Sequence, residues 1–89
     1  MEKIEKHKSI CEKLNKLYEK KNHDYGDSFS TLRKKHNNAI LIRLSDKLNR
    51  LESLYLKKDI KVEDESIVDT LIDIANYAIM EIIEIEEQK

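Results

Sequence analysis

The sequence predicts an all-α protein, a small helical bundle or hairpin of three to four helices that associates with further copies of itself. The 89 residues include one glycine and no proline, the two residue types that most often interrupt helices. Strong helix formers dominate the rest, and apolar residues recur at spacings of three and four. A chain of this length makes a single domain, residues 1–89, with a small core. We therefore expect a dimer or a larger homo-oligomer.

Charge and composition limit the classes of partner. The 17 basic and 18 acidic residues nearly cancel, but residues 1–58 hold most of the basic ones and residues 59–87 are acidic. Because no uniformly basic surface is indicated, duplex nucleic acid is not an expected partner. No apolar run approaches the roughly 20 residues that a bilayer span needs, and no signal peptide is recognisable. The single cysteine, Cys11, fits a reducing cytoplasm and is expected in the core.

The N-terminal third predicts a helix followed by a loop. Apolar residues from Ile4 to Tyr18 mark an amphipathic helix over residues 2–21 that starts near Glu2 or Lys3. Residues 20–30 interrupt the pattern and predict a loop, in which Gly26 is free to take a positive φ. The loop gathers side chains that can bind a ligand: Lys21, His23, Asp24, Tyr25, Asp27 and Ser28. The alternative is a polar turn that packs Tyr25 and Phe29 into the core.

The middle of the chain predicts two helices. Residues 31–38 form a short basic helix with a break near Asn37–Asn38, and residues 39–56 form a longer one. The expected inward face of the longer helix carries Leu41, Leu44, Leu48, Leu51 and Tyr55. Another arc of about 100° carries Arg43, Asp46, Lys47 and Arg50. Its three basic side chains form a patch suited to phosphate, or else pair with the acidic last helix.

The last helix carries an acidic ridge. Residues 57–64 predict a linker in which Glu63 or Asp64 caps a helix from Glu65 to about Glu86. An arc of about 80° on this helix holds Glu65, Asp69, Asp73 and Asn76, opposite a broad apolar face. Like charges four residues apart cost a few tenths of a kcal/mol each. We expect a divalent metal or basic side chains to compensate them, unless the ridge is simply a solvated face.

Three segments carry a family resemblance. In order they read KNHDYGDSF, RLSDKLNRL and DESIVDTLIDIANYAIM, within roughly residues 12–84. They closely resemble the nucleotide-modification-associated domain family of bacteriophages and prophage-carrying bacteria. The resemblance implies nucleotide binding in the cytoplasm of an infected or lysogenic bacterial host.

A more distant similarity links the chain to the all-α NTP pyrophosphatases of the MazG-like and dimeric dUTPase-like types. Those enzymes hold Mg²⁺ against nucleotide phosphates with a Glu-x-x-Glu pair and a Glu-x-x-Asp pair. Here Glu65 and Asp69 stand four residues apart where the later pair would be, and Asp46 is the one carboxylate on the earlier helix. This departure weakens the case for hydrolysis but not for nucleotide binding.

The residues support two main functional hypotheses. In the first, the chain sequesters a nucleotide, such as a cyclic or ADP-ribose-type signal of antiphage defence, with no cofactor required. Its nucleotide-binding residues are Lys21, His23, Asp24, Tyr25, Asp27, Ser28, Arg43, Lys47, Arg50, Asn76 and Tyr77, with Tyr25 stacked on the base. In the second, the chain is an Mg²⁺-dependent nucleotide pyrophosphohydrolase whose metal is held by Asp46, Glu65, Asp69 and Asp73.

The cationic residues favour the first hypothesis. Arg43, Lys47 and Arg50 surround Asp46 and are expected to pair with the carboxylates that a metal would need. We therefore predict binding without Mg²⁺ and with little or no turnover. A third hypothesis, a structural or protein-binding helical module, requires no ligand.

Overall fold

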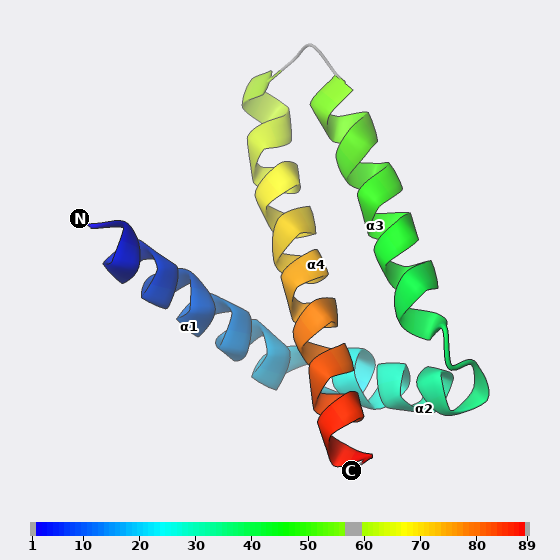
Figure 1. The fold of residues 1–89 in the computed structure, drawn as a ribbon. Coiled ribbons are helices and arrows are strands. Elements are labelled where there is room, and N and C mark those ends of the chain that lie inside the picture. The colour runs from blue at the N-terminus through cyan, green and yellow to red at the C-terminus, as the bar shows by residue number, and fades with distance from the viewer. Residues whose placement is uncertain (1, 57–59, 89) are drawn as a thin grey trace.

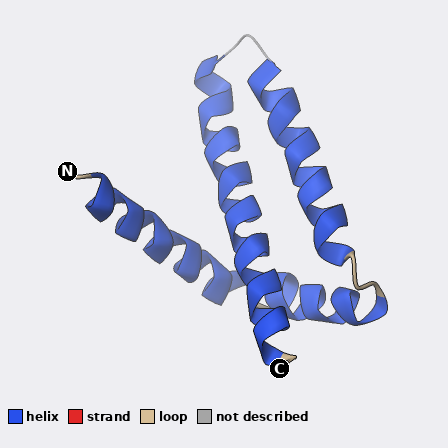
Figure 2. Ribbon diagram, in the orientation of Figure 1, coloured by secondary structure: helices blue, strands red, loops and turns tan. Residues whose placement is uncertain are grey.

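The protein is all-α, as the sequence predicts. The computed structural model describes residues 2–56 and 60–88, and side chains for residues 2–56 and 65–88. Four α-helices and one π-helical turn follow one another: α1 (Lys3–Lys21), η1 (His23–Asp27), α2 (Ser28–Lys35), α3 (Ala39–Leu56) and α4 (Ile60–Glu87). Figure 2 shows helices joined by short loops, with no strand in the described parts of the chain. None of the described helices is long and apolar enough to cross a membrane.

The helices α3 and α4 form an antiparallel hairpin, and α2 crosses beneath its open end (Figure 1). The helix α1 meets α4 near the C-terminal end of α1 and diverges from it toward the N-terminus (Figure 1). One hydrogen bond secures this meeting point, because the buried Asn76 side chain donates through Nδ2 to the Leu14 carbonyl oxygen at 3.3 Å. The first half of α1 therefore has solvent on most sides.

The core lies where α2 crosses the hairpin. It consists of Tyr25, Phe29, Ala39 and Met80, with Tyr77 packed against them. The Tyr77 ring meets the rings of Tyr25 and Phe29 edge-on, at centroid distances of 5.5 and 5.8 Å. Aromatic rings that meet edge to face contribute attraction beyond the area that they bury. This cluster fixes η1 and α2 against α4.

Polar contacts from α4 hold α2 in place. Arg33 donates from Nε and Nη2 to the two carboxylate oxygens of Glu81, at 2.9 and 3.0 Å. Ser30 donates through Oγ to Glu84 at 2.7 Å. The hydrogen bonds from Arg33 to Glu81 raise the pKa of Arg33 further, so this guanidinium stays charged at any physiological pH. Carboxylates on α4 thus position a basic helix, as the opposite charges of the two halves suggest.

Most predicted helix limits are confirmed. The first helix begins at Lys3 and ends at Lys21, the break after the second helix covers residues 36–38, and α3 spans Ala39–Leu56. The last helix is longer than predicted, since α4 already begins at Ile60. The predicted linker at residues 57–64 is therefore wrong from Ile60 onward, and its residues 57–59 lie outside the described residues. The cap predicted at Glu63 or Asp64 involves side chains that also lie outside them, but both residues are already inside α4.

Two other expectations are wrong. Residues 23–27 form a π-helical turn instead of a loop, and no described glycine has a positive φ. Cys11 is exposed instead of buried, at a groove that it lines together with Ile79 and Ile83 of α4.

The predicted inward face of α3 is also wrong in part. Leu41, Leu48 and Tyr55 are 66%, 52% and 63% exposed, whereas Leu54 is buried. The side of α3 that faces α4 is displaced by about one residue from the predicted stripe, as the contact of Lys47 with Asp73 indicates.

Candidate functional site

The turn η1 joins α1 to α2 without leaving the helical path. The Asp27 amide donates to the Asn22 carbonyl at 3.0 Å, a bond across five residues that defines a π-turn. The extra residue rotates Tyr25 and Gly26 inward and leaves His23, Asp24 and Asp27 exposed. Turns of this kind occur often at functional sites. The polar residues of the predicted loop are thus presented from a fixed backbone.

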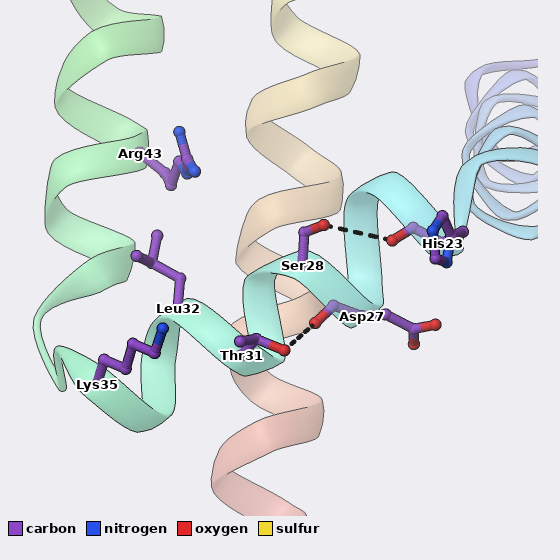
Figure 3. A pocket seen from close by; sticks show the side chains of 7 residues that line it. All are labelled: His23, Asp27, Ser28, Thr31, Leu32, Lys35 and Arg43. Atoms are coloured by element: carbon purple, nitrogen blue, oxygen red, sulfur yellow. Dashed lines mark hydrogen bonds between the residues drawn. The ribbon is translucent and has the colours of Figure 1, made fainter.

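A pocket of about 400 Å³ lies between η1, α2 and α3. It is lined by His23, Asp27, Ser28, Thr31, Leu32, Lys35 and Arg43 (Figure 3). Four of these seven, His23, Asp27, Ser28 and Arg43, belong to the nucleotide-binding residues that the sequence predicts. The volume falls within the range of small-molecule sites, about 300–1,000 Å³.

Nitrogen-bearing side chains reach this pocket from three elements. Arg43 comes from α3 and is half-buried, Lys35 comes from the last turn of α2, and His23 comes from η1. In Figure 3 the Lys35 ammonium and the Arg43 guanidinium lie on the side of the pocket away from His23. Arginine binds phosphate oxygens in a bidentate manner, and lysine adds a compact point charge. A phosphate group between Arg43 and Lys35 would satisfy both.

The polar floor of the pocket comes from η1 and α2. Ser28 donates through Oγ to the His23 carbonyl at 3.4 Å, and Thr31 donates through Oγ1 to the Asp27 carbonyl at 3.0 Å (Figure 3). The Ser28 bond is long, so this hydroxyl can turn toward a ligand at small cost. The exposed Asp27 carboxylate repels phosphate but accepts hydrogen bonds from a ribose hydroxyl or an exocyclic amine. The two ends of the pocket therefore differ in charge.

A second group of predicted residues forms a partly buried polar cluster. The Tyr25 hydroxyl donates to Asp73 Oδ1, and Lys47 Nζ pairs with Asp73 Oδ2 at 3.1 Å. Burial, followed by the hydrogen bond to Asp73, raises the pKa of Tyr25 well above its usual value. Tyr25 is only 8% exposed and its ring packs on Tyr77. The core position that the sequence left open for Tyr25 is therefore the one adopted, and we assign its ring no role in base stacking.

The remaining predicted residues lie outside the pocket. Lys21, Asp24, Asp46, Arg50, Glu65 and Asp69 are exposed, and none of them lines the pocket. Asn76 and Tyr77 pack inside, against Leu14 and Phe29. Within the described residues, no three His, Cys, Asp or Glu side chains lie close enough to hold one metal ion. The four proposed metal ligands are thus not assembled within one chain, and metal binding stays a prediction.

Three pocket residues escaped the sequence-based prediction: Thr31, Leu32 and Lys35. The sequence predicts a helix over the basic run TLRKKH, and the spacing of its residues indicates which of them share a face. Positions 28, 31, 32 and 35 lie on one helical face, which the π-turn joins to His23. What the sequence did not reveal is that α3 would place Arg43 opposite this face.

The geometry agrees with what a comparison with protein families shows. The family described as Nucleotide modification associated domain 1 matches residues 21–85, which include the pocket, α3 and all but the last two residues of α4. The chain belongs to this family. Searches of curated proteins and of solved structures found no match. The likeness to MazG-like pyrophosphatases is therefore without support from the comparisons, whereas a nucleotide-related role has the support of the family description.

Proposed function

We propose that this chain binds a nucleotide through its phosphates in the pocket between η1, α2 and α3. The observation that carries the proposal is that Arg43 of α3 and Lys35 of α2 line the same end of one pocket of about 400 Å³, opposite His23 of η1 (Figure 3). Such a set of donors suits the charge and shape of a phosphate or diphosphate. The family to which the chain belongs supports a nucleotide as the molecule that carries the phosphate.

The orientation of the nucleotide follows from the charges of the lining. Phosphates bind beside Arg43 and Lys35, and the sugar or base extends toward Asp27 and Ser28, where acceptors are available. The apolar side chain of Leu32 lines the pocket near Arg43 and Lys35 (Figure 3) and offers a surface to the ligand. Because Asp27 is acidic, a ligand with a hydroxyl or amine at that end is favoured over a bare phosphate.

We further propose that the nucleotide is sequestered and not turned over. Asp73, the one carboxylate of the predicted ridge that is partly buried, already accepts hydrogen bonds from Tyr25 and Lys47. A carboxylate neutralised in this way has little remaining affinity for Mg²⁺. A small protein that binds without turnover fits the sequestration of a cyclic or ADP-ribose-type signal.

The first test is a thermal-shift screen of cyclic dinucleotides, ADP-ribose and nucleoside triphosphates, each with EDTA and with Mg²⁺. A ligand at 100 times its Kd adds about 2.7 kcal/mol to the free energy of unfolding. We expect a nucleotide to raise the melting temperature equally in both conditions, and inorganic phosphate to raise it less.

Chromatography of the recovered ligand separates binding from catalysis. Intact nucleotide after hours with Mg²⁺ supports sequestration. Release of pyrophosphate or a monophosphate, abolished by Asp69→Asn, would instead support the Mg²⁺-dependent pyrophosphohydrolase. The absence of any shift across the screen would contradict nucleotide binding altogether.

A further inference from the structure

The helix α4 leaves a long apolar surface uncovered. One side of it faces α3, where Asp73 pairs with Lys47 and Met80 packs with Ala39. The opposite arc, about 160° wide, carries exposed large side chains: Val68, Leu71, Ile79, Ile82, Ile83 and Ile85. With the exposed Ile10 of α1 they form what we call the α1/α4 face.

This face has two shallow grooves where α1 meets α4. One, of about 280 Å³, is lined by Ile10, Leu14, Val68, Leu71 and their neighbours, and its lining is almost entirely apolar. The other, of about 170 Å³, lies on the far side of Leu14 and includes Cys11, Ile79 and Ile83. Grooves between apolar helices can receive the side chains of another helix.

The accessible surface of the chain is larger than that of a compact monomer of the same mass. A compact monomer of 10.6 kDa exposes about 5,500 Å² by the usual scaling with mass. This chain exposes 7210 Å², an excess of about 1,700 Å² over that value. Its radius of gyration is 14.6 Å, against about 12 Å for a compact domain of this length. An excess of this size matches what each subunit buries in an obligate homodimer, about 1,000–2,500 Å².

Charge favours a second copy as the occupant. The helix α1 has seven lysines and three glutamates, whereas residues 65–87 of α4 have seven acidic residues and no lysine or arginine. In a two-fold symmetric contact each subunit presents the same surface. Two α1/α4 faces that meet in this way place the basic α1 of each copy over the acidic α4 of the other.

We propose that a second copy of this chain covers the α1/α4 face, with α1 of each copy packed on α4 of its partner. This interaction is independent of the nucleotide pocket, which lies between α2 and α3. In this dimer, α1 of the partner packs on α4 in the space where α1 and α4 of one chain diverge (Figure 1).

The native Cys11 supplies a direct test, because it is exposed in one chain and lines the α1/α4 face. Its reaction with a thiol reagent is measured per chain at submicromolar and at high micromolar protein. If a second copy covers the face, we expect the rate to fall at least about fivefold at the higher concentration, since reaction requires access. A rate that does not change with concentration, or light scattering that gives a monomer mass at high micromolar protein, overturns the proposal.

Two substitutions test whether the interface lies on the α1/α4 face. Ile82→Asp alters an exposed residue of α4, and Leu48→Asp alters an equally exposed residue of α3 as a matched control. We expect Ile82→Asp to stay helical by circular dichroism, to lower the mass in solution and to abolish the protection of Cys11. Leu48→Asp should retain the protection. Protection lost in a folded Leu48→Asp, or kept in Ile82→Asp, would show that the interface lies elsewhere.

Discussion

At the scale of single residues, Asp73 connects the two halves of the chain. It lies on α4, receives the Tyr25 hydroxyl from η1 and pairs with Lys47 from α3. Bonds to a charged acceptor contribute more than neutral ones, about 1.5–3 kcal/mol where they are shielded from water. The half-exposed Lys47 contributes less than the buried Tyr25, because solvent screens its charge.

Removal of the Tyr25 hydroxyl tests this connection. Tyr25→Phe keeps the ring contact with Tyr77 but deletes the donor to Asp73, so we expect the free energy of unfolding to fall by about 1–3 kcal/mol. Tyr55→Phe is the matched control, because Tyr55 is exposed and its hydroxyl should contribute within about 0.5 kcal/mol. Chemical denaturation measures both. Equal stability of the two variants would mean that the hydroxyl bond to Asp73 contributes nothing.

The raised pKa of Tyr25 gives a second, pH-dependent prediction. The folded protein holds the Tyr25 proton more tightly than the unfolded chain, in which tyrosine ionises near pH 10. The associated stability is therefore complete below about pH 10 and declines above it, as the unfolded state loses the proton first. We expect the free energy of unfolding of the wild type to decline above about pH 10 more steeply than that of Tyr25→Phe. Parallel declines would contradict the assignment.

At the scale of elements, the π-turn is what sequence reasoning missed. Asn, Asp and the one glycine between residues 22 and 27 are typical of a loop, but here they continue a helix with one residue inserted. Gly26 is needed because the side chains of Tyr18 and Asn22 approach its Cα closely, and not because its φ is positive. A Cβ on Gly26 would lie 2.7 Å from the Tyr18 hydroxyl oxygen and 2.5 Å from Asn22 Oδ1.

We expect Gly26→Ala to lower the free energy of unfolding by about 1 kcal/mol, because the cost of moving Tyr18 and Asn22 outweighs the better helix propensity of alanine. Adding Tyr18→Phe removes the hydroxyl that a Cβ on residue 26 would meet. The free energy of unfolding of the double variant should therefore fall by less than the sum of the two single decreases. Additive losses would show that Tyr18 does not limit the space at residue 26. Denaturation of the four proteins in parallel measures the coupling.

Local patterns predicted the helices well because spacing, composition and the break at residues 36–38 are properties of short segments. Which face of each helix turns inward depends on the neighbouring helices, and the predicted inward face of α3 is wrong in part. The stripe Leu41, Leu48 and Tyr55 is regular enough to indicate a buried seam, yet it is exposed within one chain. The sequence predicts phosphate binding for Arg43 but not for Lys35. The two residues line one pocket only because α2 folds against α3, and local patterns do not reveal that packing.

At the scale of the whole molecule, the main feature is an accessible surface larger than that of a compact monomer of this mass. Association should therefore contribute to measured stability. If copies cover one another's α1/α4 faces, mass action makes the melting temperature rise with protein concentration. We expect such a rise for the wild type between low and high micromolar protein, and none for Ile82→Asp. A concentration-independent melting temperature for the wild type would mean that the folded monomer is stable alone.

The central claim, a phosphate-binding pocket between α2 and α3, is tested most directly by calorimetric titration of Arg43→Ala against Arg50→Ala, with ADP-ribose and a cyclic dinucleotide in EDTA. Both arginines lie on α3, but Arg43 lines the pocket and Arg50 is exposed outside it. Loss of a charge-assisted contact should weaken binding by about 1.5–3 kcal/mol, roughly 10- to 150-fold, in Arg43→Ala and by less than about twofold in Arg50→Ala. Equal affinities of both variants and the wild type would contradict the account, as would an equal loss in both.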